Sequence, residues 1–200
     1  MKFFQLFIFF ISISFYSQQK RNADYYAQIP EKIENEQEIR IYQGNGITNS
    51  GKIFRIFKEK NSWKAELIQW FYDKQISSDE YQSVKPIVTK LKSDKNLYEV
   101  FLNFEVRNIG FLPKENTFKY KREKQEVVYD EDSNDYVISV ISMSIVDGVD
   151  YLVKYKNGIR SNEFRYNNPQ SYLDNTPNID EYKSFLEILK YIKSEFKIEI

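Results

Sequence analysis

The stretch "DGVDYLVKYKNGIRSNEFRYNNP", residues 147–169, carries the strongest structural signals in the chain. Its Asp-Gly and Asn-Gly pairs are hairpin signals, because tight turns between antiparallel strands need residues that tolerate positive φ angles. Apolar and polar side chains alternate on both sides of the Asn-Gly pair, as in strands with one buried face. Two similar segments precede it at 126–130 and 136–146, so we predict four antiparallel strands in a β-meander.

Pairing the last two strands through the Asn-Gly turn gives a hairpin with one apolar and one polar face. On the apolar face Tyr151 lies opposite Phe164, and cross-strand aromatic pairs of this kind stabilise sheets. On the polar face Asp150 lies opposite Arg165. The apolar face should pack against a helix, and most of the hairpin needs no ligand to explain its residues.

Three side chains near this turn suggest more than a structural hairpin. Tyr155, Arg160 and Asn162 gather on the turn-proximal end of the apolar face. An aromatic ring beside a guanidinium and an amide could receive a polar ligand. We therefore predict a binding site at these three residues.

A long amphipathic helix is expected at the C-terminus, over 178–196. Asn178 with Glu181 resembles a capping box at its start. Its apolar residues recur at helical spacing and form one stripe, with charged residues opposite. The stripe consists of Ile179, Tyr182, Phe185, Leu186, Leu189, Ile192 and Phe196.

The N-terminal half also predicts strands followed by a helix. Strands are expected at 38–42, 52–58 and 63–72, the last two as a hairpin. A helix is expected near 79–92, although Pro86 interrupts it. Because both halves have this order, an internal duplication is an alternative interpretation.

A further helix is predicted within "SDKNLYEVFLNFEVRNIGFLP", residues 93–113. Ser93 or Asp94 could cap its start, and Gly110 could close its end. Four apolar residues share one helical face, namely Leu97, Val100, Phe101 and Phe104. The pattern as a whole indicates an α+β fold, an antiparallel sheet with helices packed on one face.

The run "LIQWFY", residues 67–72, has apolar side chains on both faces of its expected strand. A central strand buried on both sides would explain this run. The alternative is an exposed aromatic patch around Trp70 and Tyr72 that meets a partner. Both residues are therefore candidate binding residues.

The first 17 residues have the features of a secretory signal peptide. One positive charge, Lys2, precedes an apolar run over 3–16 that is too short for a membrane-spanning helix. Cleavage would leave residues 18–200 as one exported domain without a membrane span, in the periplasm or outside the cell. An uncleaved anchor is the alternative.

Composition excludes several classes of chemistry. Without residues 1–17 the charges nearly balance, which argues against a nucleic-acid partner. The chain has no His and no Cys, so disulfides, thiol nucleophiles, His-dependent triads and HExxH zinc sites are excluded. We expect no cofactor, no metal and no catalytic residues.

The acidic segment "DEDSND", residues 130–135, resembles the start of a calcium-binding loop. The resemblance then fails, because Asp135 replaces the required Gly and Ile141 replaces the required Glu. A hairpin tip is the favoured interpretation.

Three motifs resemble those of small exported proteins of Bacteroidota. They are "NIGFLP" at 108–113, "DGVDYLVKY" at 147–155 and "FRYNNPQSY" at 164–172, within a likeness that covers about 94–196. In that group an aromatic Y-x-NP-x-x-Y follows a DG…Y hairpin. The group has no assigned activity, so the resemblance implies a compartment and no chemistry.

The sequence as a whole favours a non-catalytic protein that binds an envelope protein or a polar ligand. One alternative is a small inhibitor or immunity-type protein that docks on an enzyme through a loop or hairpin. Another is a carboxylate-dependent hydrolase, which would need two carboxyl groups converging in one cleft.

Overall fold

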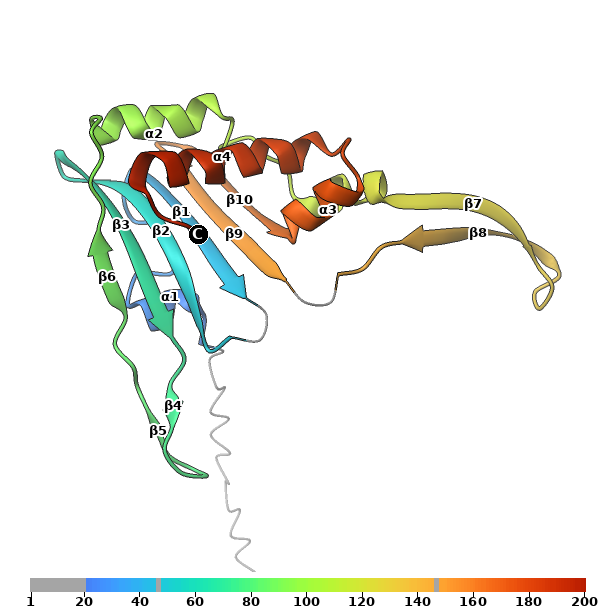
Figure 1. The fold of residues 1–200 in the computed structure, drawn as a ribbon, viewed down its shortest axis with the longest axis horizontal. Helices are drawn as coiled ribbons and strands as arrows, with labels where there is room; N and C mark the ends of the chain where they lie inside the picture. Colours follow the sequence, from blue (N-terminus) through green and yellow to red (C-terminus); the bar gives the residue numbers. More distant parts are fainter. Residues whose placement is uncertain (1–20, 46–47, 146–147) are drawn as a thin grey trace, which may run out of the picture.

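The computed structural model describes residues 21–45, 48–145 and 148–200, and the expected signal peptide lies outside them. The fold class is confirmed as α+β. A six-stranded antiparallel sheet has the strand order β10-β9-β1-β2-β3-β6, and α2, α3 and α4 cover one of its faces (Figure 1). No helix within the described ranges combines the length and apolarity that a membrane crossing requires.

The strands of the six-stranded sheet are β1 (Gln37–Asn45), β2 (Ser50–Glu59), β3 (Ser62–Phe71), β6 (Ile87–Lys90), β9 (Val149–Asn157) and β10 (Arg160–Asn167). Two separate hairpins consist of β4 (Lys74–Gln75) with β5 (Tyr81–Gln82), and β7 (Glu123–Asp130) with β8 (Asp135–Ser142). The helices are α1 (Ala23–Ala27), α2 (Leu97–Val106), α3 (Pro169–Asn175) and α4 (Asp180–Phe196), with 3₁₀ turns η1 (Glu115–Thr117) and η2 (Lys119–Arg122).

The sheet joins the two halves of the chain. Strands β2 and β3 form the expected hairpin, β1 pairs with β2, and β9 adds to the free side of β1 along its whole length. The expected four-strand meander over 126–167 is wrong in one respect, because β7 and β8 pair only with each other and leave the body as an arm. The acidic segment 130–135 is the tip of that arm, where Asp130 accepts hydrogen bonds from the Asp132 backbone and the Ser133 hydroxyl.

The main core lies between the sheet and the helices. Strand residues on this face are apolar, for example Ile39 and Ile41 of β1, and helices α2 and α4 pack over them. The expected stripe of α4 is rotated, because Leu186 and Leu189 are only half-buried. The fully packed residues of α4 are Tyr182, Phe185, Ile188, Tyr191, Ile192 and Phe196.

Both predicted helix starts differ from the structure. Asn96, and neither Ser93 nor Asp94, caps α2 by accepting a hydrogen bond from the Tyr98 N–H at 2.8 Å. The chain leaves α2 after Val106, before the expected end at Gly110. Helix α4 begins after Ile179 without a side-chain cap. The capping box fails because Glu181 binds Lys121 of the η2 turn instead.

The helix expected near 79–92 is absent, and this segment forms β5 and β6 instead. Pro86 has no backbone N–H and disfavours a helical conformation at the preceding residue. The three β-branched residues that follow, Ile87 to Thr89, favour a strand. They pair with β3 at the edge of the sheet.

The hairpin of β9 and β10 has a register two residues away from the expected one. Its two-residue turn consists of Gly158 and Ile159. Only Gly158 has a positive φ, 60°, as in a type II′ turn. A shift of two residues keeps each side chain on its expected face. Asp150 and Arg165 therefore still meet on the polar face, with Nη1 and Oδ2 2.9 Å apart.

The end of this hairpin away from its turn is held together by residues of two motifs from the sequence analysis, "DGVDYLVKY" and "FRYNNPQSY". Asn168 has a left-handed conformation, with φ 46°, and Pro169 then opens α3, a helix that the sequence analysis did not anticipate. Asn168 Oδ1 accepts a hydrogen bond from the Val149 N–H at 2.8 Å. A Cβ at Gly148 would lie 1.6 Å from the same oxygen, so this close approach requires glycine. Gly148 and Val149 therefore meet Asn168 of the NP motif in space.

Candidate functional site

The predicted cluster of Tyr155, Arg160 and Asn162 exists, but it binds another part of the chain. The Tyr155 hydroxyl donates to Glu105 of α2, and Arg160 Nη2 lies 2.9 Å from the second carboxylate oxygen. Asn157 Nδ2 also donates to Glu105, at 3.1 Å. Asn162 Nδ2 donates to the Leu112 carbonyl at 2.9 Å.

The chemistry of this cluster is that of a closed carboxylate site. Tyr155 is only 2% exposed. Burial would raise the pKa of Glu105, but hydrogen bonds from Tyr155, Asn157 and Arg160 outweigh it and hold the pKa below its usual range. Burial and the neighbouring carboxylate raise the pKa of Tyr155 to about 12. The cluster fastens α2 and the loop after it to the sheet, and Glu105 occupies the place of a ligand.

The opposite face of the sheet carries a buried ion network that the sequence analysis missed. Glu38 and Arg40 of β1 are both 0% exposed and hydrogen-bonded to each other. Arg55 of β2 donates to Glu38 at 2.6 Å and to Glu66 of β3 at 3.0 Å. Charged residues that alternate with isoleucines in "EIRIY" were the available signal, because this strand lies in the centre of the sheet.

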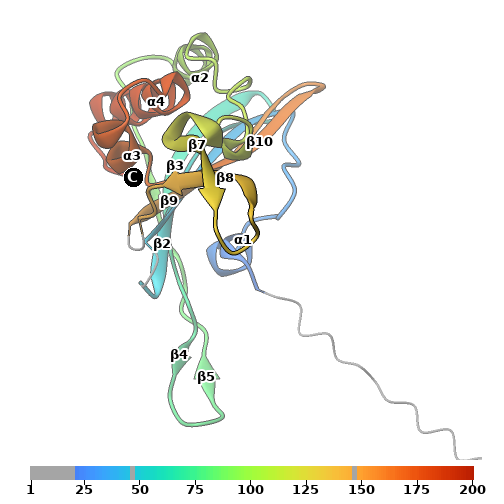
Figure 2. The same cartoon turned by 90° about the vertical axis from the view of Figure 1, so that its right-hand side faces the viewer.

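This network holds the N-terminal segment against the sheet. Asp24 of α1 is 3% exposed and accepts hydrogen bonds from Arg40, at 3.2 Å, and from the Tyr42 hydroxyl. Lys154 of β9 donates to its other oxygen at 2.8 Å. Figure 2 shows α1 on the side of the sheet away from α2 and α4.

A second, smaller core lies beneath α1 and contains Trp70. The Trp70 ring is 7% exposed and stacks on Tyr26 with centroids 6.0 Å apart. Tyr72 lies at the end of β3, contacts both rings edge-on and is 44% exposed. Of the two candidates in "LIQWFY", Trp70 is therefore buried and Tyr72 reaches solvent.

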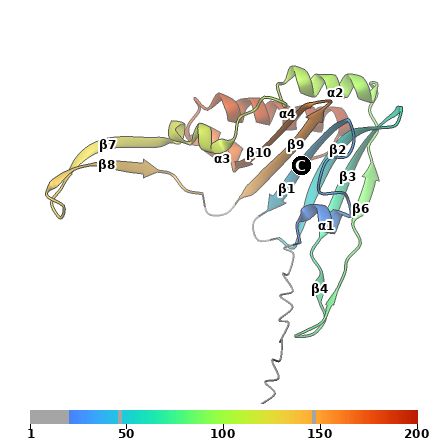
Figure 3. The same cartoon turned by 180° about the vertical axis from the view of Figure 1, so that it is seen from behind.

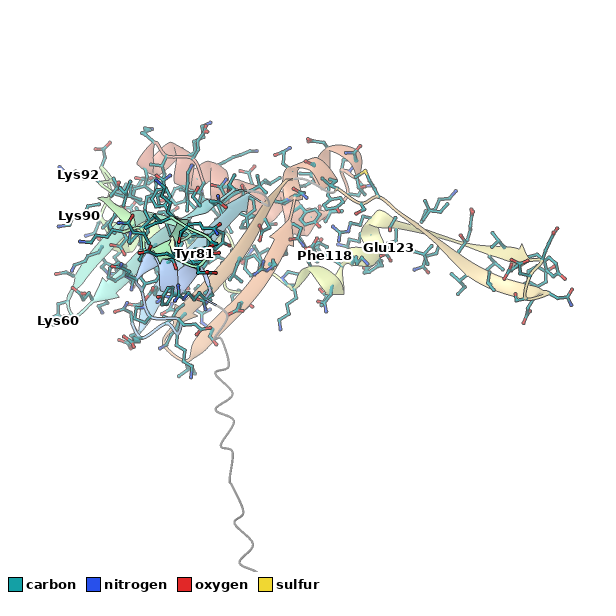
Figure 4. All side chains as sticks on the ribbon, turned by 90° about the horizontal axis from the view of Figure 1, so that it is seen from below. Lys60, Tyr81, Lys90, Lys92, Phe118 and Glu123 are labelled. Carbon is teal, nitrogen blue, oxygen red and sulfur yellow. The ribbon has the colours of Figure 1, made fainter. Side chains whose placement is uncertain are left out.

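An open groove of about 1470 Å³ begins at this aromatic cluster. It runs between α1 and the β4–β5 hairpin, which extends below the sheet (Figures 2 and 3). Three of the tyrosines that line it are exposed to solvent, Tyr25 at 53%, Tyr72 at 44% and Tyr81 at 61%. Figure 4 shows Tyr81 on the underside of the molecule. The other lining residues are Arg21, Asn22, Asp24, Tyr26, Ile29, Glu31, Asp73 and Ser83.

Two buried polar atoms, one in the groove wall and one in an adjoining hollow, make no hydrogen bond within the described residues. One is Asp73 Oδ1, whose partner oxygen pairs with Arg21. The other is the indole Nε1 of Trp70, which lines a smaller hollow of about 240 Å³ that shares Tyr72 with the groove. Asp73 thus places one buried acceptor without a partner in the wall of the groove, and Trp70 places one buried donor without a partner in the adjoining hollow.

The remaining chemistry of the described residues is limited. They contain no group of three or more side chains of the kinds His, Cys, Asp and Glu that could hold a metal ion. Where the pKa of a carboxylate is shifted, it is lowered, at Glu38, Glu59, Glu105, Glu195 and Glu199. Comparison of the chain with family models, curated proteins and solved structures finds no match.

Proposed function

We propose that the chain is a non-catalytic binding protein of the cell envelope that holds an extended, hydroxyl-rich ligand, such as an oligosaccharide, in the tyrosine-lined groove. The observation that carries this proposal is the row of exposed tyrosine rings along the groove, next to a buried acceptor without a partner at Asp73 and, in the adjoining hollow, a buried donor without a partner at Trp70. Location in the envelope rests on the signal-peptide features of residues 1–17.

The size and lining of the groove favour a ligand of this class. Its volume of about 1470 Å³ exceeds the roughly 300–1000 Å³ of ordinary small-molecule pockets. Tyrosine offers a rigid apolar ring with a polar tip, at a low cost in conformational entropy. A sugar chain has apolar faces for such rings and hydroxyls that can both donate to and accept from the polar side chains of the lining.

One observation favours the inhibitor alternative. The β4–β5 hairpin projects beyond the sheet, and Ile76 and Tyr81 on it are 57% and 61% exposed. A projecting hairpin with apolar side chains could insert into the cleft of an enzyme. A hydrolase receives no such support, because its general acid needs a raised pKa and the shifted carboxylates here are lowered.

Calorimetric titration with neutral tetra- to hexasaccharides tests the proposal. We expect saturable binding that weakens by roughly tenfold or more when Tyr72 and Tyr81 are both changed to Ala, since ring contacts of this size contribute over 1 kcal/mol. The matched control is Tyr120→Ala, because Tyr120 is 62% exposed and lies in η2, away from the groove.

The contrary outcome is equally clear. If no oligosaccharide binds at millimolar concentration, or if the Tyr120 variant loses as much affinity as the groove variant, the groove is not a sugar site. Inhibition of an envelope hydrolase by the intact chain, lost on deletion of residues 76–80, would support the inhibitor instead.

A further inference from the structure

The β7–β8 arm is a two-stranded ribbon that leaves the body of the molecule (Figure 1). Among the described residues neither strand has a third partner, so the outer edge of each keeps its backbone groups free for pairing. An isolated two-stranded hairpin is marginally stable in water. The arm therefore has the geometry of an element that is completed by a partner.

One face of the arm is apolar and open. The pairs Val127–Ile138 and Tyr129–Tyr136 lie on this face, with the tyrosine rings 5.3 Å apart. Val140 continues the face toward the body. All five side chains are between 50% and 71% exposed. Contiguous apolar surface of this kind indicates an interaction site.

The arm is also strongly acidic. Residues 123–142 contain six acidic residues and one lysine, a net charge of −5. Four of the acids gather at the tip, namely Asp130, Glu131, Asp132 and Asp135, and the structure gives none of these an ion pair within the described residues. A partner for the arm should therefore be basic.

The opposite end of the molecule has the complementary character. Strand β6 is the outermost strand of the sheet and pairs only with β3. Its Ile87 and Val88 are 56% and 52% exposed. Residues 85–92 contain three lysines and no acid, and none of the three, Lys85, Lys90 and Lys92, has an ion pair within the described residues. Figure 4 shows Lys90 and Lys92 at the end of the molecule away from Glu123 and the arm.

We infer that the arm of one copy of this chain adds to the β6 edge of a second copy, with β7 antiparallel to β6. One register satisfies both strands. It places Val127 opposite Val88 and Val128 opposite Ile87, and it pairs Asp130 with Lys85. The same register places Glu123 opposite Lys92. Addition of a strand to a free sheet edge is an established mode of recognition, with backbone hydrogen bonds for affinity and side-chain pairs for specificity.

The partner is a second copy because the two surfaces lie at opposite ends of one molecule and cannot meet within it. Such a contact joins two different surfaces, so it produces a ring if the rotation closes and an open chain if it does not. Each copy in the assembly uses both its arm and its β6 edge. This inference does not depend on a ligand in the tyrosine groove.

Cysteine cross-linking tests the register directly, since the natural chain has no cysteine. Two single variants, Val88→Cys and Val127→Cys, are mixed and oxidised. We expect a disulfide-linked dimer that contains one of each, because disulfides need Cα atoms within about 7 Å. The control mixes Val127→Cys with Val106→Cys, a valine on α2 that is 78% exposed. Equal cross-linking in the two mixtures, or none in the first, overturns the inference.

Charge reversal tests the same contact without cysteines. One variant reverses the edge, Lys85→Glu with Lys92→Glu, and another reverses the two residues of the arm that face them, Asp130→Lys with Glu123→Lys. Each alone should raise the apparent dissociation constant of assembly by roughly 100-fold or more in sedimentation velocity, because like charges then meet. Mixing the two variants should restore assembly. The control is Lys183→Glu with Lys190→Glu on α4, which makes the same change in net charge.

Three outcomes would contradict the inference. The wild type could stay monomeric at low salt, which would mean that the lysines of β6 only protect an edge. The edge variant could assemble like the wild type while the arm variant does not, which would place the arm on another surface. The mixture of both variants could fail to assemble. Circular dichroism of each variant checks that the fold is intact.

Discussion

The two faces of the six-stranded sheet are built by alternate residues of the same strands, yet different interactions stabilise them, apolar packing on one face and buried ion pairs on the other. In β1, Ile39 and Ile41 point to the face under α2 and α4, where apolar and aromatic side chains fill the core. Glu38 and Arg40 point to the other face, where they are buried in an ion network. The first face gains stability from apolar area removed from water. The second must satisfy each buried charge, which makes the position of the N-terminal segment specific.

The largest expected effect comes from breaking the ion network. We expect Glu38→Leu to lower the free energy of unfolding by about 3–5 kcal/mol, because Arg40 and Arg55 would lose the carboxylate that they share. Urea denaturation measures this loss. The control on the other face is Ile39→Val in the same strand, which should cost about 0.5–1.5 kcal/mol. A smaller loss for Glu38→Leu than for Ile39→Val would show that the network contributes little.

The pH dependence of stability should also come from the charged face, with a smaller effect. Burial would raise the pKa of Glu38, but hydrogen bonds from Arg55 and Arg40 outweigh it and hold the pKa below its ordinary range. The stabilisation from Glu38 is therefore complete above its unfolded pKa of about 4.3 and is lost as pH falls through the lower folded pKa. Protonation removes the charge and leaves the side chain in place, so less is lost than on truncation.

Comparison with Glu38→Gln isolates this contribution. The difference in free energy of unfolding between the wild type and Glu38→Gln should be constant near neutral pH and should shrink in the acid range below about pH 4. The same measurement on Ile39→Val should give a difference that does not change with pH. If the difference in free energy of unfolding between the wild type and Glu38→Gln stays constant or grows in acid, the lowered pKa of Glu38 is contradicted.

The apolar face was largely predictable, because its signals are local. The spacing of Leu97, Val100, Phe101 and Phe104 is enough to specify α2, and alternation specifies the strands. The order of the strands was not predictable in the same way. Strand β9 has β1 as its neighbour instead of β8, although β8 precedes it in the chain. Nothing in the local pattern distinguishes these partners, since the choice depends on contacts over 100 residues apart.

The candidate sites show the same limit. Tyr155, Arg160 and Asn162 lie together on one face, as the sequence predicts, but Glu105 of the same chain lies where a polar ligand was expected. Glu105 could not be predicted as their partner, because it lies in the last turn of α2, a helix whose position on the sheet is decided by the whole core. Trp70 and Tyr72 lie two positions apart in "WFY", but Trp70 is covered by α1, whereas Tyr72 lies just beyond the end of β3 and reaches solvent.

The smallest expected effect lies where the two kinds of packing meet, at Glu105. This carboxylate sits at the margin of the apolar face, and its partner Arg160 is 47% exposed. We expect Glu105→Ala to lower the free energy of unfolding by about 1–3 kcal/mol, because the buried Tyr155 hydroxyl loses its acceptor. The control on the same helix is Glu99→Ala, at an exposed position, with an expected change within about 0.5 kcal/mol.

Rescue by a small carboxylate distinguishes a filled binding site from ordinary packing. In Glu105→Ala the donors Tyr155, Asn157 and Arg160 remain and face the space that the carboxylate left. Formate that binds there should stabilise the folded state in proportion to the logarithm of its concentration, once this exceeds its dissociation constant. Sodium chloride at equal ionic strength and the wild type in formate should show no such gain. If formate fails to stabilise the variant selectively, Glu105 acts through the packing of α2 alone, and the charged character of the cluster has no part in holding the helix to the sheet.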